Sequence, residues 1–290
     1  MLTSRRSLAM TAGMFACLAV AAVLVVNTGV IAATQAQKDA ICAVIEASIN
    51  SPTGALGQAT AGGPVHINNR ANIPTLVGKV KTAVPNGVAA SCFDCLINDA
   101  DTKVCIVIGQ GTNNASVSGA ADIVIAITQD STSTDAGDAS ATNTQTAGGA
   151  AIAWGGEGHN PGANGTNQSG GGSATSSTTG GDAHSHAGNG GGGRRAGANG
   201  GDASATTGTT GTAHAEAGDG GDPANNNRKG GDSGAAQTTS TSSGGGTNTQ
   251  SVGAAAGTSG TPGTHGLGGS STASGGSSTG QTNSSTTPNV

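Results

Sequence analysis

The chain has 290 residues, 53 of them glycine, and a formal net charge of −5. Leu, Ile, Val and Phe together make up only 40 of the 290 residues, below the roughly 20% at which disorder is expected. Lys and Arg number 11 against 16 Asp and Glu. This balance does not fit a protein that binds nucleic acid through a basic surface.

Residues 1–36 have the pattern of an export signal. Arg5 and Arg6 precede an apolar run from Leu8 to Val26, and small residues follow. A cleaved signal peptide and an uncleaved membrane anchor both fit, since the run is just long enough to span a bilayer. In either case we expect the rest of the chain outside the cytoplasm, either secreted or at the cell surface. It would then touch the membrane only through an uncleaved N-terminal segment.

Residues 37–130 are predicted to form a small α+β domain. Apolar residues recur at helical spacing over 41–49 and 73–84. Short β-branched runs at 103–109 and 121–129 indicate strands. The segment 109–119 between them is predicted to be a loop or a wide hairpin connection.

Four cysteines follow the export signal: Cys42, Cys92, Cys95 and Cys105. In an exported chain they indicate two disulfides, and three pairings are open. A bridge from Cys42 would join the first helix to the sheet. The Cys-x-x-Cys pair also fits a redox dithiol or part of a zinc site, but the sequence lacks the thioredoxin-like context and the usual zinc spacing.

Residues 131–290 form a low-complexity region rich in Gly, Ser, Thr and Ala. Gly-Gly-Asp recurs at 180–182, 200–202, 220–222 and 230–232. Pairs of glycines therefore recur at a spacing of ten residues, and more strongly at a spacing of twenty. We predict a largely disordered tail. The alternative is a stacked β or polyglycine-type array. Ala213, Ala215 and Ala217 would lie on one side of an extended segment, as would Ala183, Ser185 and Ala187.

The Gly-Gly-Asp punctuation with small residues between resembles the glycine-rich repeat proteins of bacterial envelopes, including the repetitive regions of the mycobacterial PE-PGRS proteins. The resemblance covers roughly 148–235, and the N-terminal module of that family is not recognisable. It implies a surface or secreted setting.

No catalytic constellation is recognised, and no catalytic, cofactor-binding or metal-binding residue is predicted. We expect solvated side chains at His184 and His186 rather than a metal site. The hypothesis is an exported structural or matrix protein without catalytic activity. Its tail would be a spacer, or would associate with other copies of the chain or with an envelope component. The alternative is a secreted binding module, in which residues 37–130 recognise an envelope polymer or protein and the tail is a stalk.

Overall fold

The computed structural model describes parts of the chain from residue 32 onwards. The described residues are 32–58, 64–110, 113–117, 122–129, 138–143, 149–158, 171–179, 181–191, 198–207, 211–220, 232, 234–240, 247–252, 271–273 and 277–283. Residues 1–31, which make up nearly all of the predicted export signal, lie outside this part. Among the described residues, no helix is long and apolar enough to cross a membrane.

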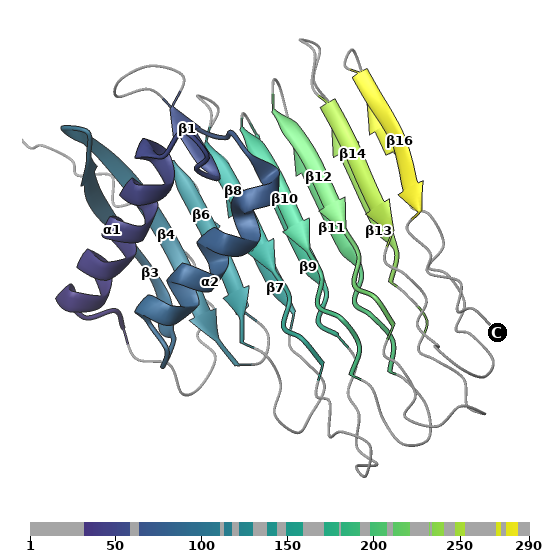
Figure 1. The fold of residues 1–290 in the computed structure, drawn as a ribbon, viewed down its shortest axis with the longest axis horizontal. Helices are drawn as coiled ribbons and strands as arrows, with labels where there is room; N and C mark the ends of the chain where they lie inside the picture. Colours follow the sequence, from purple (N-terminus) through teal and green to yellow (C-terminus); the bar gives the residue numbers. More distant parts are fainter. Residues whose placement is uncertain are drawn as a thin grey trace, which may run out of the picture.

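Two helices form a layer on one face of a large sheet. Helix α1 spans Gln35–Asn50 and α2 spans Ile73–Ala83, preceded by a 3-10 turn at Arg70–Asn72. Both helices were predicted from their apolar spacing, and both bury that face. They pack over strands β3 (Val88–Ile97), β4 (Ala100–Gly109), β6 (Ile123–Thr128) and β8 (Ala150–Trp154), as Figure 1 shows. A short hairpin of β1 (Leu56–Gln58) and β2 (Val65–Ile67) joins the two helices.

Two disulfides fix this end of the molecule. Cys42 of α1 is bonded to Cys95 of β3, and Cys92 of β3 is bonded to Cys105 of β4. The prediction of two disulfides is confirmed, and the Cys42 bridge joins helix to sheet as expected. Because the two cysteines of the Cys-x-x-Cys pair have different partners, they are not a dithiol, and none of the four is free to bind zinc.

Beyond β4 the chain alternates between two parallel sheets. The larger sheet continues from β4, β6 and β8 through β10 (Asp182–His186), β12 (Thr212–Glu216), β14 (Thr247–Val252) and β16 (Ser277–Asn283). The second sheet contains β5 (Asn113–Val117), β7 (Ala139–Asn143), β9 (Ala174–Thr178), β11 (Ala203–Thr207), β13 (Ala236–Ser240) and β15 (Ser271–Ala273). Each coil of the chain thus adds one strand to each sheet.

The segment 109–119 is neither a simple loop nor a hairpin connection. It contains β5, which belongs to the second sheet, and β4 and β6 are parallel neighbours. Parallel neighbours require a crossover, and here the crossover is a strand of the opposite sheet. The sequence prediction was wrong because β5 reads "NNASV" and lacks the β-branched run of β6.

Small side chains fill the space between the two sheets. Near the N-terminal end, Val107, Val124 and Ala126 pack against Ala115 and Ala141. Farther along, the cluster consists of alanines alone: Ala183, Ala187, Ala203, Ala205, Ala213, Ala215, Ala217 and Ala236. The prediction of a small domain followed by a disordered tail is therefore wrong. The ordered strands continue past residue 130, in an arrangement of the stacked β kind that was named as the alternative.

At one rim of the stack, backbone hydrogen bonds rather than large apolar side chains hold successive coils together. The amide of Gly188 donates to the carbonyl of Gly172, and the amide of Gly201 donates to that of Gly188. A Cβ on Gly188 would overlap the carbonyl oxygen of Gly156. A Cβ on Gly201, the second glycine of a Gly pair, would likewise overlap the carbonyl oxygen of Gly172. Glycine is therefore required where the backbones of successive coils approach this closely.

The Asp and Asn residues of the repeats bond to the next coil. Asp182 Oδ1 accepts from the Thr212 amide at 2.7 Å, 30 residues later. Asp202 Oδ1 accepts from the Ala235 amide at 2.8 Å, 33 residues later. The structural repeat is thus about one coil of 30 residues, and the spacings of ten and twenty in the sequence are not the coil length.

Candidate functional site

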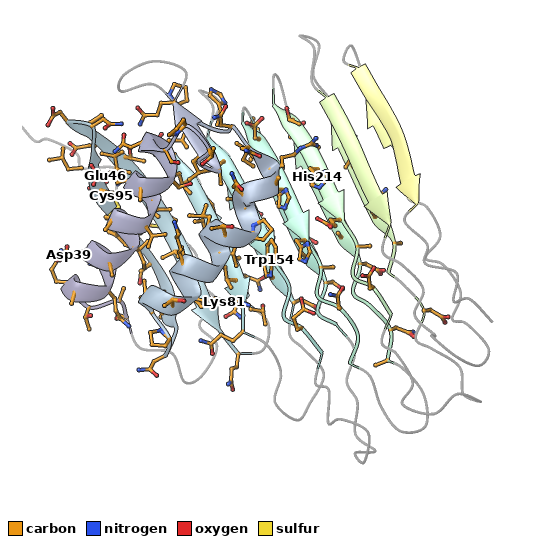
Figure 2. The ribbon with its side chains drawn as sticks, in the orientation of Figure 1. Asp39, Glu46, Lys81, Cys95, Trp154 and His214 are labelled. Atoms are coloured by element: carbon orange, nitrogen blue, oxygen red, sulfur yellow. A yellow bond between two sulfur atoms is a disulfide. The ribbon has the colours of Figure 1, made fainter. Side chains whose placement is uncertain are left out.

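A cluster of polar side chains lies on the larger sheet just beyond the helix layer. It stands on the face that the helices cover at β3–β8 (Figure 2), and it is formed by β8, β10 and β12. In β10 and β12 the alanines and Ser185 point toward the second sheet, so the alternate residues point to this face. On this face β10 presents Asp182, His184 and His186.

In-register pairing brings side chains of neighbouring strands together. His184 is the register partner of His214, and His186 is flanked by Trp154 and Glu216. Neighbouring strands lie about 4.8 Å apart, so side chains in register stack on one another. The His184 and His214 rings stack at 4.9 Å, and the Trp154 and His186 rings at 3.8 Å between centroids.

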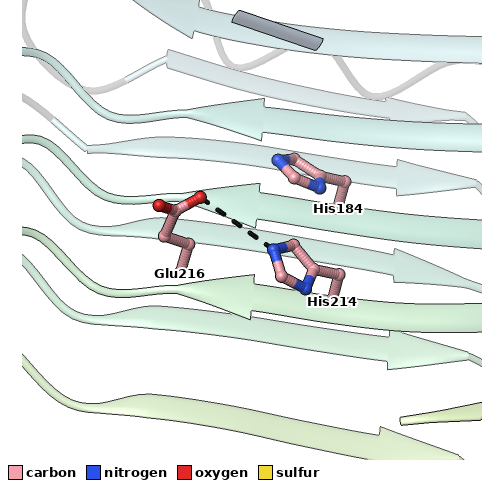
Figure 3. A group of neighbouring side chains, drawn as sticks. All are labelled: His184, His214 and Glu216. Atoms are coloured by element: carbon pink, nitrogen blue, oxygen red, sulfur yellow. Dashed lines mark ion pairs between the residues drawn. The ribbon is translucent and has the colours of Figure 1, made fainter. Parts of the chain in front are cut away.

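Glu216 is the negative charge of this cluster. Its Oε2 lies 3.3 Å from His186 Nδ1 and 3.9 Å from His214 Nε2. Figure 3 shows the contact with His214. The polar contact with His186, followed by that with His214, holds the pKa of the Glu216 carboxyl well below its usual value. Glu216 is therefore ionised at neutral pH.

His184 lies in a different environment from the other members. It is 2% exposed, and neither ring nitrogen has a hydrogen-bond partner within the described residues. Burial, followed by the nearby His214 and His186, lowers the pKa of His184 well below its usual value. His184 is therefore neutral at pH 7. Leaving a buried polar group without a partner costs about 1–3 kcal/mol.

Arg70 approaches the cluster from the turn before α2. Its Nη1 lies 3.3 Å from His214 Nδ1. Because a guanidinium only donates hydrogen bonds, Nδ1 of His214 is the acceptor, and Nε2 carries the proton in this arrangement. The side chain of His214 thus lies between a cation and the carboxylate of Glu216.

Asp182 anchors the loop that borders the cluster. Its Oδ2 accepts from the Ile67 amide at 2.8 Å, its Oδ1 accepts from the Thr212 amide, and His66 Nδ1 lies 3.7 Å from Oδ2. A cavity of about 490 Å³ opens beside these residues. It is lined by Ile67, Asn68, Asn69, Arg70, Ala71, Asp182, Ala183, His184, Thr212 and His214.

The expectation of solvated histidines is wrong for His184, which is buried, and His186 is mostly covered by its neighbours. Sequence reasoning did not connect His214 and Glu216 with these residues. The signal was present, because residues 183–188 and 213–218 share the pattern Ala-His-x-x-Ala-Gly. Aligning the two segments at the coil length would have placed the residues side by side.

Comparisons of the chain with protein-family models, with curated proteins and with solved structures give no match.

Proposed function

We propose that the protein is an exported, non-catalytic structural protein of the cell surface or extracellular matrix, in which the two-sheet stack is a stiff, hydrated spacer. The observation that carries the proposal is the coil repeat. Each coil adds one strand to each sheet, and hydrogen bonds join equivalent positions 30 and 33 residues apart. The number of coils then sets the length of the stack.

The outer face of the second sheet suits a spacer in an aqueous environment. Its described side chains are all polar and uncharged: Asn114, Ser140, Thr142, Thr175, Ser177, Ser204, Thr206 and Gln237. Such a surface is hydrated without attracting ions. Two disulfides fit an oxidising compartment, in agreement with the export signal and with the likeness to glycine-rich envelope proteins.

Lengthening the stack tests the spacer. Three extra copies of residues 172–200, inserted after residue 200, add three coils. At each junction Gly200 takes the place of Gly171 before Gly172, so every Gly pair is kept. At about 4.8 Å per strand, the stack should lengthen by roughly 14 Å. Small-angle X-ray scattering on the purified chain measures this. A collapsed or coil-like product, or an unchanged maximum dimension, contradicts the proposal.

Export and self-association are tested separately. Protease added to intact producing cells should cleave the protein, while a cytoplasmic control protein stays intact until the cells are lysed. Sedimentation velocity over a concentration series distinguishes a monomeric spacer from a self-associating element. A protein that is protected in intact cells is not at the surface.

A second candidate is the binding module, and the cavity is the observation that favours it. Residues 67–71, within the segment 37–130, form one of its walls. The test is binding of the purified chain to isolated envelope material, compared with Ala71→Trp, which fills the cavity. Equal binding by both proteins, or none, refutes a role for the cavity.

A further inference from the structure

We propose that His184, His214 and Glu216 bind one divalent transition-metal ion, for which Zn²⁺ is the best-suited candidate. This inference goes beyond the spacer function and does not depend on it. The strongest single observation is His184, because both of its ring nitrogens are buried and have no hydrogen-bond partner in the described part of the chain. Nearly all buried polar groups in proteins have a partner, and an absent ion is one of the few explanations for an exception.

The three side chains form a donor set of known chemistry. Their ligand atoms all lie within 4.8 Å of one another. Two imidazoles and a carboxylate bind Zn²⁺ at about 2.0–2.2 Å and leave a fourth position open for water or another ligand. Small rotations of the side chains would bring the donor atoms to these distances. The cavity of about 490 Å³ is lined by two of the three residues and gives an ion a route to the site.

Two of the three ligands offer donor atoms at the cluster. His184 offers ring nitrogens that have no hydrogen-bond partner among the described side chains. Glu216 offers a carboxylate oxygen, Oε2, which lies 3.9 Å from His214 Nε2.

The third ligand, His214, has to move its ring proton before it can bind a metal, and this requirement gives the proposal a further test. Binding a metal through Nε2 of His214 requires the ring proton to lie on Nδ1, where Arg70 now donates. One proton leaves Nε2 and one is taken up at Nδ1, so no net proton is released. Arg70 is exposed and belongs to a short turn, so it can turn away. Arg70 is thus a competitor of the metal, through its hydrogen bond and its charge.

Isothermal titration calorimetry with ZnCl₂ tests the site on the full purified chain after EDTA treatment and dialysis. We expect one Zn²⁺ per chain. Affinity should fall at least tenfold in Glu216→Gln and in His184→Leu. It should rise in Arg70→Gln, which removes the competing cation. His66→Gln is the matched control, because His66 is a nearby histidine that faces Asp182 and is not a ligand. It should bind Zn²⁺ as the wild type does.

Thermal unfolding with and without Zn²⁺ gives a second readout. Zn²⁺ should raise the Tm of the wild type and of His66→Gln, and EDTA should reverse the shift. Glu216 has a half-exposed side chain, so Glu216→Gln is expected to fold and keeps the test decisive if His184→Leu does not. The proposal is overturned if the wild type shows no saturable 1:1 binding, or if Glu216→Gln binds Zn²⁺ as tightly as the wild type.

Discussion

Acidification should destabilise the protein through His184, and the effect can be isolated by comparing the wild type with His184→Leu in the presence of EDTA. The folded-state pKa of His184 lies well below the unfolded value of 6.5, because of burial and of the facing His214 and His186, with Arg70 adding to the effect and Glu216 opposing it. Above pH 6.5 neither state binds a proton at His184. Below it only the unfolded state does, so the free energy of unfolding falls as the pH falls.

The slope of this loss is set by one proton. Well below pH 6.5, and while the folded state stays unprotonated at this ring, the loss approaches about 1.4 kcal/mol per pH unit. The pKa of Glu216 is also lowered, but its contribution is lost only as the pH falls through its unfolded value of 4.5, below this window. The measurement is urea unfolding at half-unit steps from pH 7.5 to 5.0. Equal slopes for wild type and His184→Leu would refute the reasoning.

Three further predictions concern a glycine of the stack, the disulfide between α1 and β3, and the hydrogen bonds of Asp182. Gly188→Ala should abolish folding of the stack or lower its Tm sharply, because the new Cβ overlaps the Gly156 carbonyl. Thermal unfolding followed by circular dichroism measures this, and an unchanged Tm would contradict the prediction. Replacing Cys42 and Cys95 by Ala should lower the free energy of unfolding by about 4 kcal/mol for a loop of this length, and a loss under 1 kcal/mol in denaturant unfolding would contradict it. Asp182→Ala leaves two backbone amides unpaired and should cost about 2–4 kcal/mol, whereas Asp182→Asn, which keeps one acceptor oxygen, should lose less by the same measurement.

The sequence was informative wherever large apolar side chains decide the structure. The spacing of Ile41 and Ile45, and of Leu76 and Val80, predicted α1 and α2, because a helix that packs on a sheet must bury one face. The β-branched run of β6 predicted a strand. Both of its faces are buried, however, because the helices cover one face and the second sheet covers the other.

The rest of the fold could not be read from hydrophobicity. Strands such as β11 ("ASATT") and β12 ("TAHAE") carry no large apolar residue, so any scale of side-chain burial assigns them to a disordered tail. Their order depends on ladder hydrogen bonds, glycine crossings and the Asp and Asn contacts between coils. These interactions exist only once the coils are stacked in register.

The candidate site was missed for the same reason. His184 and His186 were seen as a pair along one strand, which ordinarily means two solvated rings. Their neighbours His214 and Glu216 are supplied by the next coil. The coil length was needed to bring the four together, and the spacing of the glycine pairs concealed it.

The position of the disulfides makes the molecule mechanically asymmetric. Both bridges tie α1, β3 and β4, at the end of the larger sheet where the stack begins. No cysteine follows Cys105, so the later coils have no such bridge. A pulling force on the C-terminal end would therefore peel off coils one at a time, while the N-terminal end holds. Each coil of about 30 residues would release roughly 100 Å of extended chain. A protein built this way would yield stepwise under load and absorb work, where a single cooperative domain would rupture at once.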